Sequence, residues 1–163
     1  MQRIPLAISP GVNARLSAGV QNGLVKKIIN EFCPRFTPGG IPVYVTDADR
    51  KWAYFDTGYL RNLGVVVDEH GRMPNVVVHC TNKGWLFLIE AMTSHGPVSP
   101  RRLTELKSLF AGSSAGLLFV TTFLSRRGVS KYLGDVAWGT GVWVADAPDH
   151  MIHFNGERLL GPY

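Results

Sequence analysis

The chain has 163 residues, of which 45% are hydrophobic and 18% are charged, and its formal net charge is +5 at pH 7. This length and composition predict one folded domain with a sizeable core and exclude a disordered chain. No apolar run approaches the roughly 20 residues of a transmembrane helix, and the N-terminus lacks the apolar segment of a signal peptide. Cys33 and Cys80 are too few for a disulfide framework or a zinc site, so we expect free thiols in a cytoplasmic protein. The positive charge favours a polyanionic partner, although charge alone does not identify one.

The first predicted element is a helix over residues 12–33. Its apolar residues recur at a spacing of four, which is typical of one face of a helix: Leu16, Val20, Leu24, Ile28 and Phe32. Gly19 and Gly23 weaken its middle, each by roughly 1 kcal/mol relative to alanine. The segment "CPRFTPGGIP" then ends the helix.

The remaining elements alternate between strands and helices. We expect strands at 43–47 and 52–56, a short helix at 57–64, and strands at 74–80 and 85–91. Ser99 and Pro100 are typical of a helix start, and that helix should end near Gly112. A buried strand at 115–123, a broken helix at 125–138, a strand at 141–146 and a turn at Asn155-Gly156 follow. The order predicts a mixed α/β domain with three layers, and no glycine-rich phosphate motif follows a strand.

The strands at 74–80 and 85–91 predict a β-hairpin that turns through Asn82 and Lys83. In a two-residue loop Val77 faces Leu88, and Asn75 then faces Glu90 at the open end. Two oxygen-bearing side chains at that spacing can bind a hard divalent ion such as Mg²⁺. A glycine bulge at Gly84 would instead shift the pairing by one residue. The residues alone also allow a simpler interpretation, in which Glu90 is a strand-end carboxylate that reaches solvent and Asn75 is an ordinary strand-start residue.

Two long motifs carry a resemblance to a known family. "WLFLIEAMTSHGPVSPRR" at 85–102 and "DHMIHFNGERLLGPY" at 149–163 resemble the catalytic domain of the BsuBI/PstI family of type II restriction endonucleases. The likeness extends from about residue 8 to the last residue. It implies a restriction-endonuclease-like fold of the PD-(D/E)xK type, a three-layer mixed sheet flanked by helices. It also implies one catalytic domain over residues 1–163, without the N-terminal helical domain of full-length members.

The resemblance further implies a function. A family member of this kind would cleave duplex DNA at a short palindrome similar to CTGCAG, with Mg²⁺ as cofactor, within a restriction–modification system. It would work as a homodimer, because a two-fold site matches two-fold protein symmetry. Two alternatives stay open: a non-catalytic DNA-binding or regulatory module that keeps the fold, and a structural partner of an active subunit.

The family pattern transfers only in part to the catalytic positions. Glu90 falls on the catalytic glutamate and would be a metal ligand, whereas Asn75 stands where the family pattern has aspartate and would be a weakened ligand. The lysine of the general fold would fall on Met92, and glycines replace expected acids at Gly23, Gly139 and Gly141. A loss of about 4 kcal/mol at Asn75 would lower the rate roughly a thousandfold, so weakened or absent cleavage is expected. Asn75 is either an engineered change or natural divergence, and Gly23 favours divergence.

The basic and polar residues that follow Glu90 are the candidate DNA contacts. Ser94 and His95 would contact a phosphate or a catalytic water, or else fix a loop by hydrogen bonds. Arg101 and Arg102 would contact phosphates or substitute for the missing lysine, or else form a solvated face. Lys26, Lys27, Arg126 and Arg127 are interpreted as surface charges, and His150 with His153 is not expected to bind metal.

Overall fold

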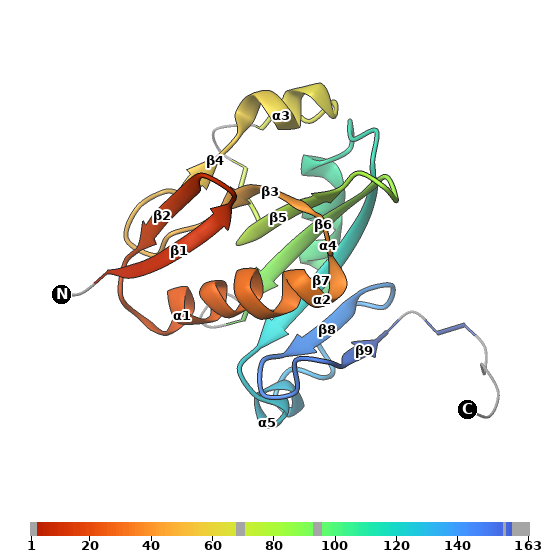
Figure 1. Ribbon diagram of the computed structural model, residues 1–163. Helices are drawn as coiled ribbons and strands as arrows, with labels where there is room; N and C mark the ends of the chain where they lie inside the picture. Colours follow the sequence, from red (N-terminus) through yellow and green to blue (C-terminus); the bar gives the residue numbers. More distant parts are fainter. Residues whose placement is uncertain (1–2, 68–70, 93–95, 155, 158–163) are drawn as a thin grey trace.

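A computed structural model describes residues 3–67, 71–92, 96–154 and 156–157. Within these residues a seven-stranded mixed sheet forms the centre of the molecule (Figure 1). Its strands, in sheet order, are β4 (Tyr54–Phe55), β3 (Ile41–Val45), β5 (Val76–Cys80), β6 (Trp85–Ala91), β7 (Gly116–Phe123), β8 (Gly141–Val144) and β9 (Met151–His153). The neighbours β6–β7 and β7–β8 are parallel, and the other neighbouring pairs are antiparallel. A second, two-stranded sheet contains β1 (Ile4–Ser9) and β2 (Val12–Leu16).

Helices cover both faces of the large sheet. A long helical segment lies on one face together with the β1–β2 hairpin, and it consists of α1 (Val20–Lys27), a π-helical stretch (Ile28–Phe32) and α2 (Cys33–Phe36). Residues of α3 (Thr57–Asn62) and α4 (Pro100–Leu109) pack on the other face. The short α5 (Arg126–Ser130) belongs to a third apolar cluster beside β7 and β8. The three layers confirm the predicted fold class.

The central strands are apolar throughout because both of their faces are covered. Val76, Val78 and Ile89 pack in the cluster that contains α1, whereas Val77 and Leu88 pack in the cluster that contains α4. Successive side chains of a strand point to opposite faces, so each strand contributes to two cores. Glu90 has the same parity as Leu88 and therefore emerges on the α4 side.

The hairpin register is the predicted one. Val77 pairs with Leu88 and His79 pairs with Leu86, so the shifted alternative is wrong. The tight connection uses Gly84 at φ +65°, a left-handed conformation that glycine adopts without strain. Asn75 and Glu90 thus occupy the open end of this hairpin.

The predicted first helix is wrong at its beginning. Residues 12–16 form β2, which pairs antiparallel with β1, and the helix begins at Val20. The alternation of Val12, Ala14 and Leu16 with polar residues is a strand pattern that the spacing of four concealed. Gly19, at φ +145°, separates the strand from the helix.

Several other boundaries also differ from the predictions. The strand expected at 52–56 is reduced to two residues, and the broken helix expected at 125–138 is helical only as α5. The strand β9 was not predicted, and the turn expected at Asn155-Gly156 includes a residue outside the described part of the chain. The helix start at Ser99 is confirmed, since its hydroxyl accepts a hydrogen bond from Arg102 N at 3.2 Å. Across the described residues, no helix has the length and apolar character of a bilayer-spanning segment.

Candidate functional site

Glu90 is a buried carboxylate near the end of a central strand. Its strand β6 lies between antiparallel β5 and parallel β7, and Thr122 of β7 donates its hydroxyl to the Glu90 backbone oxygen at 2.9 Å. The side chain is only 8% exposed. Placing a carboxylate there is costly unless a positive charge and hydrogen bonds compensate it. The interpretation of Glu90 as a strand-end carboxylate that simply reaches solvent is therefore wrong.

Arg102 supplies that compensation. Its Nε and Nη2 atoms donate to Oε1 of Glu90 at 2.9 and 2.6 Å, and Nη2 also donates to the backbone oxygen of Arg72 at 2.9 Å. The side chain is 5% exposed, because the first turn of α4 packs it against the sheet. The solvated-face alternative for Arg102 is wrong. A cation thus lies directly on the candidate catalytic carboxylate.

Asn75 lies at the start of β5 with its amide oxygen already engaged. Oδ1 accepts a hydrogen bond from Ala91 N at 2.8 Å, so the side chain joins the ends of β5 and β6. The amide nitrogen can only donate, and Asn75 therefore offers a metal ion nothing beyond the remaining capacity of one neutral oxygen. An aspartate in this position would keep the Ala91 bond and present a second, charged oxygen.

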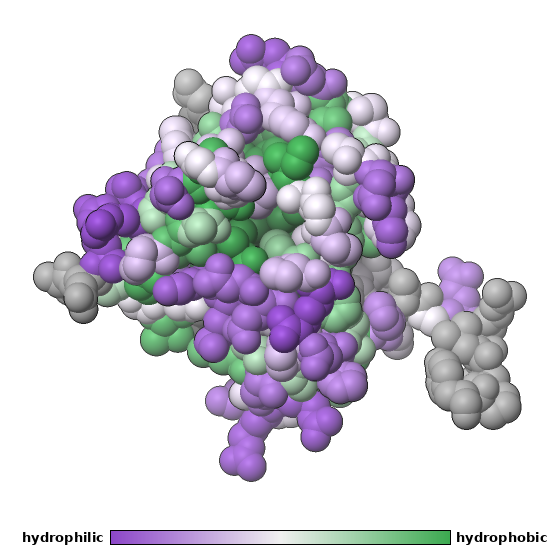
Figure 2. Space-filling view, in the orientation of Figure 1, coloured by the Kyte–Doolittle hydropathy of each residue, from purple (hydrophilic) through white to green (hydrophobic). Residues whose placement is uncertain are grey.

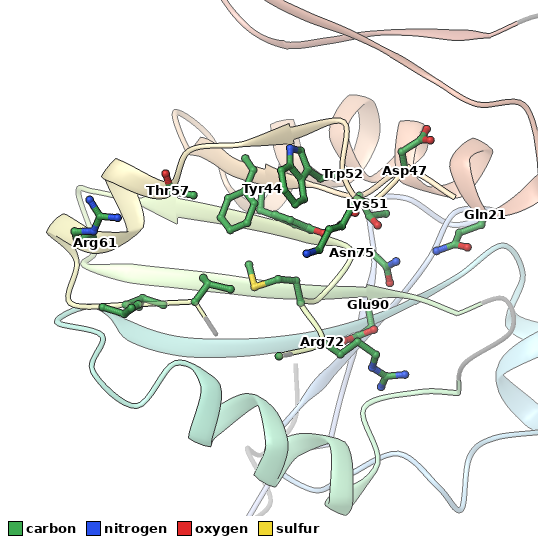
Figure 3. A pocket seen from close by; sticks show the side chains of 17 residues that line it. Gln21, Tyr44, Asp47, Lys51, Trp52, Thr57, Arg61, Arg72, Asn75 and Glu90 are labelled. Atoms are coloured by element: carbon green, nitrogen blue, oxygen red, sulfur yellow. The ribbon is translucent and has the colours of Figure 1, made fainter. Parts of the chain in front are cut away.

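Glu90, Asn75 and Arg72 lie at one side of a cavity of about 550 Å³. Its other walls carry Tyr44, Trp52 and Phe55, and a green hollow with a partly polar rim is visible on this face in Figure 2. In the close-up, Arg61 and Glu90 appear toward opposite ends of the cavity, with Trp52 and Tyr44 above it (Figure 3). The cavity gives a ligand access to the Glu90 region.

Asp47 is a second buried carboxylate beside this cavity, and sequence reasoning missed it. It accepts hydrogen bonds from Ser17 N at 2.7 Å, from Ser17 Oγ at 2.8 Å and from Asn22 Nδ2 at 3.1 Å. Burial alone would raise its pKa, but the donors on Ser17, Arg50 and Asp49 outweigh burial and lower the pKa to about 2. These bonds fasten the N-terminal hairpin and α1 to the end of β3. Its position two residues after the apolar run "IPVYV" was the available signal.

The glycines that replace expected acids differ in their surroundings. A Cβ atom added at Gly23 would meet no atom within 4 Å, so this position of α1 has room for a side chain. Gly139 has a φ of +83°, and a Cβ at Gly141 would lie 2.9 Å from Met151 Cε. Backbone conformation explains Gly139, whereas at Gly141 only the flexible end of Met151 would have to move to admit a Cβ atom.

The structure also places two other residues that the sequence analysis singled out, Arg101 and Met92. Arg101 is 91% exposed and pairs with Glu105 at 3.4 Å, which leaves it accessible on the surface. Met92, at the expected lysine position, packs against the cluster of Phe123 and Val129. Ser94 and His95 lie outside the described residues. Within the described part of the chain, no group of three or more histidine, cysteine or acidic side chains could hold a metal.

Comparison with known proteins gives consistent matches. The family model described as the BsuBI/PstI restriction endonuclease domain matches residues 4–157. The chain is 51% identical over 161 residues to the type II restriction enzyme BsuBI of Bacillus subtilis, a match that covers 99% of this chain and 51% of that protein. It is 28% identical over 166 residues to the type II restriction enzyme AplI of Arthrospira platensis, covering 98% of this chain and 51% of that protein.

A solved structure matches as well. The structure of the SdaI restriction endonuclease superposes with a TM-score of 0.93 at 44% sequence identity, and the match covers 99% of this chain and 51% of that one. The chain therefore spans about half the length of the relatives that it matches.

Proposed function

Because this chain belongs to the BsuBI/PstI restriction endonuclease domain family, we propose that it is the DNA-cleaving part of a type II restriction endonuclease. The observation that carries the proposal is the buried Glu90 carboxylate, paired with Arg102 at the edge of an open cavity. A charge buried at this cost beside a cavity is typical of a functional site.

A divalent ion, Mg²⁺ in our proposal, fits this site through one carboxylate. Both hydrogen bonds from Arg102 go to Oε1 of Glu90, so that arginine leaves Oε2 unused. Asn75 would add its neutral oxygen, while water and phosphate oxygens would complete the coordination that Mg²⁺ commonly adopts. When bound, such an ion polarises the phosphate and supplies hydroxide at neutral pH.

The cation of Arg102 takes the role that a lysine has in the general nuclease pattern. Met92 places an apolar side chain at the lysine position, and Arg102 brings a guanidinium to Glu90 from α4 instead. A guanidinium can hold a carboxylate and a phosphate oxygen with separate N–H groups. Arg102 would thus orient Glu90 and stabilise charge that develops on the phosphate.

The DNA itself would lie across the face that holds Asn75, Glu90 and Arg101. Arg101 is exposed at the start of α4, next to the buried Arg102, and can contact a backbone phosphate. Ser94 and His95 stay candidate contacts from the sequence. We further propose a homodimer and a palindrome similar to CTGCAG, on the family resemblance.

The second candidate function is that of a module that keeps the nuclease fold and binds DNA without cleaving it, and Asn75 favours this function. The amide oxygen is engaged by Ala91 N, and the charge of Glu90 is balanced by Arg102, so the apo site has little negative charge to attract an ion. Cleavage weakened relative to an aspartate-containing site is the expected result.

A plasmid-nicking assay tests the proposal, with Mg²⁺ and Mn²⁺ supplied separately. Glu90→Gln is the matched control, because it keeps the size of the side chain and removes the charge. Cleavage that requires a divalent ion and disappears in Glu90→Gln supports the nuclease. If nothing is cleaved, a gel shift on duplex DNA in Ca²⁺ distinguishes a DNA-binding module from a structural partner that binds no DNA.

A further inference from the structure

The cavity beside Glu90 is larger and more aromatic than a phosphate and a metal ion require. We propose that it receives one nucleobase of the bound DNA, turned out of the helix next to the phosphodiester at Glu90. This inference rests on the proposed function, since it needs duplex DNA on the Glu90 face. Its volume of about 550 Å³ is within the range of roughly 300–1,000 Å³ that small-ligand pockets occupy.

The aromatic wall of the cavity consists of Tyr44, Trp52 and Phe55, whose rings are in contact, and Trp52 is only partly covered. The rings of Tyr44 and Phe55 are 5.0 Å apart at 87°, and those of Trp52 and Phe55 are 5.2 Å apart at 86°. The hydroxyl of Tyr44 donates to the Lys51 backbone oxygen at 3.2 Å, which fixes the turn that carries Trp52. These contacts hold Trp52 in place and leave part of its ring free for stacking.

The exposed apolar surface at the cavity calls for an occupant. Trp52 is 41% exposed and Val66 is 75% exposed, and both line this cavity. Large apolar side chains that border one cavity are stabilised when a flat apolar group fills it. A nucleobase is such a group, and extruded bases are held between aromatic and apolar side chains in enzymes that unstack DNA.

The charges around the cavity suit a ligand that carries phosphate. Lys51, Arg61 and Arg72 line it, and Lys51 Nζ lies 5.5 Å from the centre of the Trp52 ring. The two lining carboxylates are already compensated, Glu90 by Arg102 and Asp47 by its hydrogen-bond donors. The lining therefore has an excess of positive charge, which a neutral apolar ligand would not use.

The position of the cavity selects which nucleotide would enter. Asn75 and Glu90 belong to the lining, so a base in the cavity would lie close to the phosphate bound at Glu90. Thr46, Thr57 and Gln21 also line the cavity and offer hydrogen bonds to a base edge. Stacking on an aromatic ring contributes about 1–3 kcal/mol per base, which offsets part of the cost of unpairing.

A scan of unpaired bases tests the inference on the full chain. Duplexes that contain CTGCAG are bound in Ca²⁺ and followed by fluorescence anisotropy, and the partner of each base in turn is replaced by an abasic residue. Removing the partner lowers the cost of extrusion, so binding should tighten about tenfold or more at one position of each strand and stay constant elsewhere. Uniform binding across the scan overturns the inference.

Substitutions at the aromatic wall provide a second test of the inference. Trp52→Ala should weaken binding about fivefold to a hundredfold and abolish the position-dependent gain, while Trp52→Phe should retain most of both. Trp138→Ala is the control, because Trp138 is 79% exposed and lies outside the cavity. Equal effects of Trp52→Ala and Trp138→Ala, or a Trp52 effect without position dependence, overturn base extrusion while leaving DNA binding intact. A chain that binds no duplex at all overturns the proposed function as well.

Discussion

Arg102 donates two hydrogen bonds to the same oxygen of Glu90, from Nε at 2.9 Å and from Nη2 at 2.6 Å. Both side chains are nearly inaccessible to solvent. Breaking a buried ion pair leaves one uncompensated charge in the interior, which costs far more than the intact pair contributes. The pair therefore links the stability of the domain to its candidate catalytic residue.

Replacing Arg102 should destabilise the chain and disable the site together. Arg102→Ala is expected to lower the free energy of unfolding by about 3–5 kcal/mol, measured by urea titration followed by circular dichroism. Arg101→Ala is the matched control, since that neighbouring side chain is exposed and its loss should cost less than about 0.5 kcal/mol. Combining Arg102→Ala with Glu90→Gln should cost less than the sum of the two changes. Additive costs would show that the two residues do not act as a pair.

Asp47 should make the domain sensitive to acid. Its pKa is about 2 in the folded chain, below the ordinary 3.8, because N–H and O–H donors stabilise the charged form against burial. A depressed carboxyl pKa contributes stability above the unfolded value, and the contribution is lost as the pH falls from about 5 through 2. The loss should amount to about 2 kcal/mol, measured as the change in unfolding free energy between pH 7 and pH 2.

The matched variant for this prediction is Asp47→Asn. It should be less stable than the parent at pH 7, and its stability should change less over the same pH range. Asp135→Asn, at an exposed position, is the control and should follow the parent curve. A parent and an Asp47→Asn variant with parallel pH profiles would show that Asp47 is not the group responsible.

The centre of the fold could be predicted from the sequence because its signals are local. The tight turn after Thr81 and the apolar strands on each side fix the β5–β6 register, and the register places Glu90 at the open end of the hairpin. Ser99 and Pro100 likewise define the start of α4. Each of these features depends on residues close together in the chain.

The rest of the fold and of the candidate site depends on contacts between distant segments, which the spacing of residues along the chain does not reveal. The strand β2 has the alternation of a strand, yet only its pairing with β1 excludes the helix that a spacing of four suggests. Arg102 is twelve residues from Glu90 and on another element, so a surface role was as reasonable as the buried pair. The burial of Asp47 depends in part on Ser17, thirty residues earlier, which supplies two of its hydrogen-bond donors.

The glycine positions should respond differently to substitution. Gly23→Glu should be tolerated or slightly stabilising, by up to about 1 kcal/mol, because the position is open and glycine is a poor helix former. Gly139→Ala should be destabilising, because Gly139 has a φ of +83°, a backbone conformation that residues with a side chain rarely adopt. Thermal melting of both variants beside the parent measures the difference. Equal melting temperatures for the two variants would contradict this account of the glycines.

Asn75→Asp should tighten the binding of Mg²⁺ or Mn²⁺, measured by calorimetry. One oxygen of the new carboxylate would keep the hydrogen bond from Ala91 N, and the other would add a negative charge beside Glu90. Asn30→Asp, on an exposed position of the helical segment, adds the same charge elsewhere and should leave the affinity unchanged.

A double variant decides whether Asn75 and Glu90 form one site. Adding Glu90→Ala to Asn75→Asp should abolish the gain in affinity, because the new carboxylate would bind the ion together with Glu90 and the effects of residues that share one ligand are not additive. Equal affinities for the parent, the single variant and the double variant would exclude a shared metal site. If the affinity rises without any cleavage, a further acid is missing, and Gly23→Glu is the next change to combine, since the structure leaves room for that side chain.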